Sequence, residues 1–165
     1  MTYAFIFPGQ GSQYVGMGKN LITDFPNTKR VFEQLDDELS QNLTDIIFDG
    51  PEDQLTLTEN AQPALFAVSI AIVRVLRDEF GIDLSEVGTF AAGHSLGEYS
   101  ALAAFDSIQF SDGVKVLKAR GKAMQAAVSN GKGAMAAILG LNTLNVEKIV
   151  ETLKNYKIGI KSITA

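Results

Sequence analysis

The chain has 165 residues, of which 46% are hydrophobic and 20% charged, with no cysteine, one histidine and a formal net charge of -5. This length and apolar content predict one globular domain, or one domain and the start of another, with a packed core. Without cysteine there can be no disulfide or thiolate ligand, and a single histidine argues against a zinc cluster, so we expect no metal site.

The charge is distributed unevenly along the chain. Residues 1–113 carry 5 Lys and Arg against 17 Asp and Glu, whereas residues 114–165 carry 9 against 2. A basic segment of this kind can be a solvated face or a docking surface for an acidic partner. We do not expect nucleic acid as that partner, because the lysines have few interleaved aromatic residues and no binding motif.

Neither a secretory signal nor a membrane span is expected. The first apolar run has no basic residue before it and no small-residue cleavage site after it. The longest apolar run, residues 64–73, is about half the length of a membrane span and is followed by Arg74 and Arg77. The sequence therefore predicts a cytoplasmic protein.

Strand and helix patterns alternate through the first 128 residues. Residues 3–7 predict a buried strand that ends at Pro8 and Gly9, and a loop, "PGQGSQ", follows. Asn27 is the expected N-cap of an amphipathic helix. Residues 58–82 predict a core helix with Pro63 near its first turn and Gly81 after its last turn.

The next elements are a strand over residues 88–95, a small-residue helix over 96–105 and a helix over about 111–128. Glycine, serine and asparagine in residues 129–133 indicate a linker. Beyond it the patterns predict a strand over 134–141, a helix over 145–156 and a further strand over 157–163.

The stretch "AAGHSLGEYSA" contains the most informative motif. Gly93, Ser95 and Gly97 have the spacing of a nucleophile elbow (residues 93–97), a sharp turn between a strand and a helix that exposes a serine hydroxyl. A serine needs a base and donors for the developing oxyanion. The backbone N–H of Leu96 is the expected first donor, but His94, next to the serine, is poorly placed to be its base. The alternative is a tight turn whose serine only caps the helix.

Four segments together resemble the malonyl-CoA:acyl-carrier-protein transacylases. They are "IFPGQGSQYVGMG", "TENAQPALFAV", "GHSLGEYSALAA" and "KARGKAMQAAV", in the order and at about the separations of that family. The resemblance extends over essentially the whole chain. It implies transfer of malonyl from malonyl-CoA to the phosphopantetheine thiol of acyl carrier protein, through an acyl-serine, in fatty-acid biosynthesis, with no cofactor beyond the phosphopantetheine that the partner carries.

By matching position, the resemblance makes Ser95 the nucleophile, Gln10 and the Leu96 N–H the oxyanion hole, and Arg120 the ligand of the malonyl carboxylate. Gln62 and His94 would support these groups without contacting the substrate themselves. A guanidinium suits a carboxylate because it can donate two parallel hydrogen bonds, which lysine cannot reproduce. The alternative is that Arg120 is a solvated helix residue among lysines. Glu98 is expected to serve the first turn of the elbow helix, and Tyr14 and Tyr99 are expected to be packing residues.

The resemblance implies an α/β fold: an incomplete α/β-hydrolase-like core in residues 1–130, then the first half of a ferredoxin-like subdomain in residues 131–165. Full-length members are about twice this long and place their catalytic histidine downstream of the serine, in a segment absent here. A complementing C-terminal fragment is therefore one expected partner. Two other functions remain open: a serine hydrolase or thioesterase, and a non-catalytic fragment that binds the carrier protein.

Overall fold

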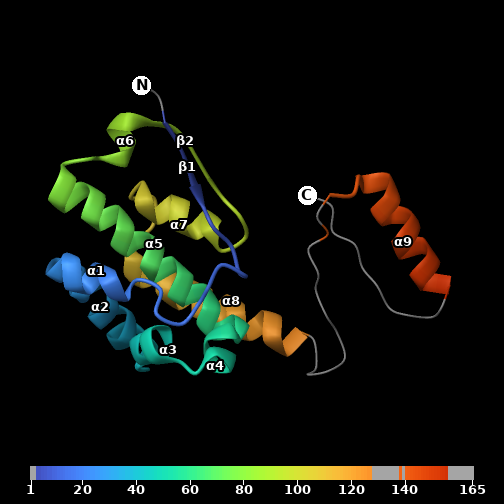
Figure 1. The fold of residues 1–165 in the computed structure, drawn as a ribbon, viewed down its shortest axis with the longest axis horizontal. Coiled ribbons are helices and arrows are strands. Elements are labelled where there is room, and N and C mark those ends of the chain that lie inside the picture. The colour runs from blue at the N-terminus through green and yellow to red at the C-terminus, as the bar shows by residue number, and fades with distance from the viewer. Residues whose placement is uncertain (1–2, 128–137, 139, 156–165) are drawn as a thin grey trace. The chain divides into compact units, whose positions relative to one another are not determined.

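The computed structural model describes residues 3–127, 138 and 140–155 (Figure 1). The chain divides into two compact units, Met1–Ser129 and Asn130–Ala165. The predicted linker (129–133) and final strand (157–163), and most of the predicted strand over 134–141, lie outside the described residues. In the second unit the predicted helix is present as α9 (Thr143–Asn155).

The first unit is an α/β structure in which helices predominate. Its elements, in chain order, are β1 (Tyr3–Phe7), α1 (Lys19–Asp24), the 3-10 turn η1 (Pro26–Thr28), α2 (Lys29–Leu39), α3 (Leu43–Asp49), α4 (Glu52–Thr56), α5 (Thr58–Phe80), α6 (Leu84–Val87), β2 (Gly88–Gly93), α7 (Gly97–Ala104) and α8 (Phe110–Ala127).

The two strands form a parallel pair that positions the elbow. Phe7, the last residue of β1, lies opposite Gly93, the last residue of β2. The His94 N–H continues the pairing by donating to the Phe7 carbonyl at 3.1 Å. Because the carboxyl ends of parallel strands meet at one edge, the loop after β1 and the elbow after β2 lie side by side.

Helix α5 is the centre of the core and contacts α2, α7 and α8 (Figure 1). Its residues are buried on nearly all sides, as its apolar sequence predicts. Phe66 of α5 stacks on Phe110 of α8 with ring centroids 5.4 Å apart. Gly81 ends α5 in a left-handed conformation, with φ of 65°, as expected of a glycine after the last turn.

Among the described helices, α5 alone is long and apolar enough to cross a membrane by length and composition. Of its most apolar window, 72% is buried inside the fold. Burial of this extent is what a core helix of a globular domain shows, so the composition of α5 is explained by packing.

The prediction that Asn27 caps a helix is wrong. Pro26 begins η1, which includes Asn27 and continues directly into α2 at Lys29. Asn27 therefore lies inside a helical turn and not at its boundary. The hydroxyl of Thr28, the residue before α2, is occupied elsewhere: it donates to the carbonyls of Leu21 and Phe25 at 3.0 and 2.8 Å.

Candidate active site

The elbow has the strand, turn and helix context that the motif requires. β2 ends at Gly93, Ser95 has a φ of 57°, and α7 begins at Gly97. A positive φ is uncommon for a residue other than glycine and costs conformational energy that the surroundings must supply. Ser95 is exposed, as a nucleophile that meets a substrate must be.

The two glycines of the motif are required by close backbone packing. A Cβ on Gly93 would overlap the backbone of Gly97. A Cβ on Gly97 would overlap the Phe7 carbonyl and lie 2.8 Å from that of Pro8. A real Cβ does not come this close to backbone atoms, so both positions require glycine. The spacing of the motif therefore follows from the packing of α7 against the ends of β1 and β2.

The Leu96 N–H belongs to the elbow, and the loop after β1 packs against the elbow through Gly9. The Leu96 N–H donates to no acceptor among the described residues, although its side chain is fully buried. Gly9 packs on His94, whose carbonyl would be 2.7 Å from a Cβ at that glycine. Gln10 follows, and its Nε2 donates to Thr58 Oγ1 of α5 at 3.2 Å. Leu96 thus has an unpaired backbone donor at the elbow among the described residues, whereas the Gln10 side chain already donates to α5.

The guanidinium of Arg120 points at the serine. Its Nη2 donates to Ser95 Oγ at 3.0 Å, and its Nη1 donates to Gln62 Oε1 at 2.6 Å. The guanidinium carbon also lies 6.0 Å from the centroid of the Tyr99 ring. No carboxylate pairs with Arg120 among the described residues. Within the described part of the chain, Arg120 is thus held by hydrogen bonds but has no carboxylate partner. A solvated helix residue would not be held in this way.

Gln62 is buried in α5 and bonded through both ends of its amide. Its Oε1 accepts from Arg120, and its Nε2 contacts Met124 Sδ at 3.3 Å. A thioether is a weak acceptor, so the bond to Arg120 is the stronger of the two. Gln62 therefore fixes the orientation of Arg120 by accepting a hydrogen bond from Nη1, while Nη2 faces Ser95.

The other residues singled out in the sequence have simpler surroundings. His94 is exposed and no hydrogen bond joins it to Ser95 among the described residues, so it is not arranged as a base. Glu98 is exposed in the first turn of α7, as expected. Tyr99 packs partly against the core, as expected. The prediction that Tyr14 is a packing residue is wrong, because it is 63% exposed.

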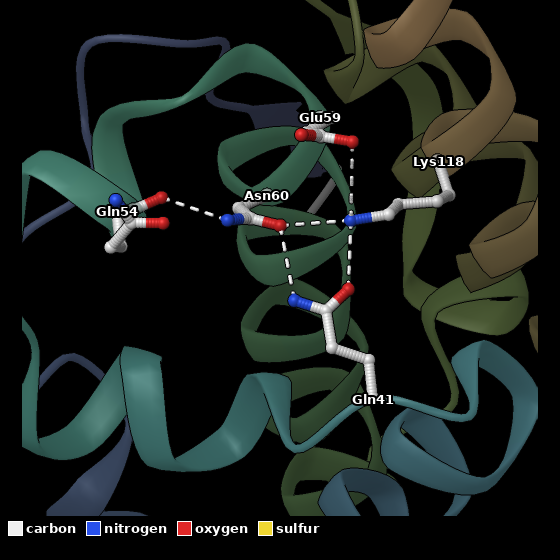
Figure 2. A network of polar contacts seen from close by, with 5 residues as sticks. All are labelled: Gln41, Gln54, Glu59, Asn60 and Lys118. Carbon is white, nitrogen blue, oxygen red and sulfur yellow. Dashed lines mark hydrogen bonds and ion pairs between the residues drawn. The ribbon is translucent and has the colours of Figure 1, made fainter.

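The sequence gives no sign of a polar cluster beside this site (Figure 2). Lys118 Nζ of α8 donates to Gln41 Oε1 at 2.8 Å and to Asn60 Oδ1 at 2.9 Å, and lies 3.7 Å from Glu59 Oε2. The Lys118 side chain is only 14% exposed. Burial lowers the pKa of Lys118, and the nearby Glu59 carboxylate opposes that effect. Lys118 is therefore bound within the fold and is not part of a free basic surface.

The comparisons with known proteins identify the family. The family model described as acyl transferase domain matches residues 4–154. The chain belongs to the acyl transferase domain family. Over 148 residues it is 47% identical to the malonyl CoA-acyl carrier protein transacylase of Bacillus subtilis strain 168, with 90% of this chain and 45% of that protein covered. This confirms the resemblance on which the site assignments depend.

Solved structures of acyltransferases share the fold. The acyl-carrier-protein-S-malonyltransferase of Bartonella henselae matches with a TM-score of 0.88 and 52% identity, covering 94% of this chain and 49% of that chain. A malonyl-transacylase solved in complex with its type II polyketide acyl-carrier protein matches with a TM-score of 0.86 and 39% identity, at the same coverage. The chain therefore spans about half the length of these acyltransferases.

Proposed function

We propose that the chain forms the nucleophile half of a malonyl-CoA:acyl-carrier-protein transacylase of fatty-acid biosynthesis. The observation that carries the proposal is the Arg120 guanidinium, which Gln62 holds and which is directed at Ser95 with no carboxylate partner among the described residues. A malonyl group places its carboxylate one methylene from the thioester carbonyl. A guanidinium 3.0 Å from the attacking hydroxyl is within reach of that carboxylate.

In the proposed reaction Ser95 Oγ attacks the thioester carbonyl of malonyl-CoA and the hydroxyl loses its proton to a base. The Leu96 N–H and the Gln10 amide stabilise the oxyanion, the C–S bond breaks, and coenzyme A leaves as its thiol after taking up a proton. The phosphopantetheine thiol of the carrier protein then attacks the acyl-serine, which regenerates the serine. The carrier brings its own phosphopantetheine, so this chain needs no cofactor.

The base is proposed to come from outside the 165 residues of this sequence. The resemblance places the catalytic histidine downstream of the serine, and His94 is not arranged to replace it. An apolar groove of about 370 Å³ lies along β1 and α5, lined in part by Ile6, Tyr14 and Ile72. Ile6 is 81% exposed, and Phe90 on β2 is 72% exposed. Parallel strands are normally covered on both faces, so these surfaces support a complementing polypeptide segment as a partner.

The finer description of the fold is part of the same proposal. Residues 1–130 would belong to an α/β-hydrolase-like core and residues 131–165 to the start of a ferredoxin-like subdomain. We also propose that the protein acts in the cytoplasm, where both acyl donor and carrier are dissolved. A serine hydrolase or thioesterase is less well supported, because such an enzyme has no need for an arginine held beside its serine. A non-catalytic carrier-binding fragment leaves the strained φ of Ser95 unexplained.

The proposal is tested by the intact mass of the chain after incubation with malonyl-CoA, alone and with the second half of a relative. We expect a malonyl adduct on Ser95, located by peptide mapping, that requires the second half and is absent from Ser95→Ala. Addition of carrier protein should then remove the adduct and malonylate the carrier. Release of free malonate without carrier acylation would identify a hydrolase. Carrier binding without any adduct would identify the non-catalytic fragment.

A further inference from the structure

The Lys118 cluster (Lys118, Gln41, Gln54, Glu59 and Asn60) joins α8, α5, α4 and the connection between α2 and α3 (Figure 2). Lys118 comes from α8, Gln41 from the connection between α2 and α3, and Glu59 and Asn60 from the first turn of α5. Asn60 Nδ2 donates to the Gln54 carbonyl at 2.9 Å, and Gln41 Nε2 donates to Asn60 Oδ1 at 3.3 Å. The acceptors around the ammonium are therefore themselves held in place.

The cluster lies where α8 and α5 approach most closely. A Cβ on Gly121 of α8 would be 2.6 Å from Glu59 Cα and 2.7 Å from the Thr58 carbonyl. At this crossing Lys118 precedes Gly121 by one turn, and Arg120 is the residue next to that glycine. The same two helices are joined a second time by the bond from Arg120 to Gln62.

We propose that Lys118 is a positioning residue that fixes the register of α8 on the first turn of α5 and so aims Arg120 at Ser95. This inference rests on the proposed function, because it assigns Lys118 to the selectivity of the same site for a carboxylate-bearing acyl group. Lys118 touches no reacting atom in this arrangement. It acts through the backbone of α8, two residues before the arginine.

A polar cluster specifies position more strictly than apolar packing does. A methionine could fill the space of the Lys118 stem without the cost of burying an ammonium, so the cluster is a poor means of gaining stability alone. Gln41 and Asn60 accept from the ammonium at 2.8 and 2.9 Å, which few placements of the helix allow. Because Lys118 and Arg120 lie two residues apart on α8, a slide of α8 along α5 would disturb these bonds and the bond between Arg120 and Gln62 together.

The inference is tested with Lys118→Met in a length-complete version of the protein. The readout is the ratio of kcat/KM for acyl-Ser95 formation from malonyl-CoA to that from acetyl-CoA, well below the melting temperature and without carrier protein. We expect the ratio to fall about fivefold to tenfold, because a 1 Å misplacement can cost about 100-fold and Lys118 acts through another residue. Contacts to coenzyme A cancel in this ratio.

Lys115→Met is the matched control. Lys115 is on the same helix, and its side chain is 58% exposed and pairs with Glu38 of α2 at 2.7 Å. Its variant should keep the wild-type ratio. If Lys118→Met does not fold, Gln41→Leu removes one acceptor of the ammonium and should lower the ratio by a smaller factor. The inference is overturned if Lys118→Met keeps the wild-type ratio. If Lys118→Met does not fold, it is overturned if Gln41→Leu keeps that ratio.

A second measurement separates this inference from the proposed function. If the wild type transfers no malonyl, the proposed function fails, and amide hydrogen exchange in residues 119–124 decides whether Lys118 fixes α8. Faster exchange there in Lys118→Met than in Lys115→Met supports the positioning role. Equal exchange in the two variants overturns it.

Discussion

On the proposed function, replacing Arg120 with alanine should remove the preference for malonyl over acetyl. The guanidinium lies 3.0 Å from Ser95 Oγ and is held by Gln62 at 2.6 Å, so it is oriented before any substrate binds. Each of two charge-assisted hydrogen bonds to a carboxylate contributes about 1.5 to 3 kcal/mol of binding free energy, which is about 3 to 6 kcal/mol for the pair. Taking the lower half of that range, we expect a loss of about 3 to 4 kcal/mol for malonyl, or about 100-fold to 1,000-fold.

Initial rates of acyl-Ser95 formation from malonyl-CoA and acetyl-CoA give the two values of kcat/KM in a length-complete protein. Acetyl lacks the carboxylate, so its value should change little in Arg120→Ala. Arg120→Lys is the control for charge: it keeps the cation but not the planar fork, and should fall between wild type and alanine. Equal losses for the two donors would refute the reasoning, because Arg120 would then act on Ser95 itself.

Two further predictions concern the contact between α5 and α8. Gly121→Ala should lower the free energy of unfolding by about 2 kcal/mol, because a clash with the backbone of Glu59 costs about 3 kcal/mol and the higher helix propensity of alanine returns about 1. Urea denaturation measures this difference, and a variant more stable than the wild type would contradict the close approach. Burial lowers the pKa of Lys118 in the folded state, so the unfolded chain binds more protons between that pKa and the ordinary value of about 10.4. The free energy of unfolding of the wild type, minus that of Lys118→Met, should therefore rise with pH across that window. If this difference does not change between pH 7 and 10.5, the pKa of Lys118 is not lowered in the folded state.

The elements that carry the site were predictable because each has a strong local signal. The strand over residues 3–7 ends at Pro8, the core helix is apolar on nearly all sides and ends at Gly81, and the elbow has glycines on both sides of its serine. Each signal reports an interaction within a few residues or a backbone conformation that few residues adopt. The structure has these elements within one or two residues of the predicted bounds.

The errors and the omission have different causes: a local turn for Asn27, an unfilled groove for Tyr14 and contacts between distant segments for Lys118. Asparagine is common at the N-cap of helices, but here Pro26 begins a 3-10 turn that includes Asn27. Tyr14 is aromatic, yet it lies on the rim of a groove that no described residue fills. Lys118 is one of several lysines in a basic segment, and nothing near it in the sequence distinguishes it. Its partner Gln41 is 77 positions away, and only the packing of α8 on α5 brings them together.

The first five residues of α5 hold Gln10, Lys118 and Arg120. Thr58 accepts from Gln10 of the loop after β1, Glu59 and Asn60 hold Lys118, and Gln62 holds Arg120. Ser95 has a strained φ on a turn that has no freedom to shift, because both flanking glycines are in backbone contact. Ser95 and the Leu96 N–H are thus fixed by the ends of β1 and β2, while the Gln10 side chain and the Arg120 guanidinium are bonded to α5. A substitution of Gln62 should therefore alter acyl selectivity without touching the serine, whereas a substitution of Gly93 or Gly97 should abolish acylation by every donor alike.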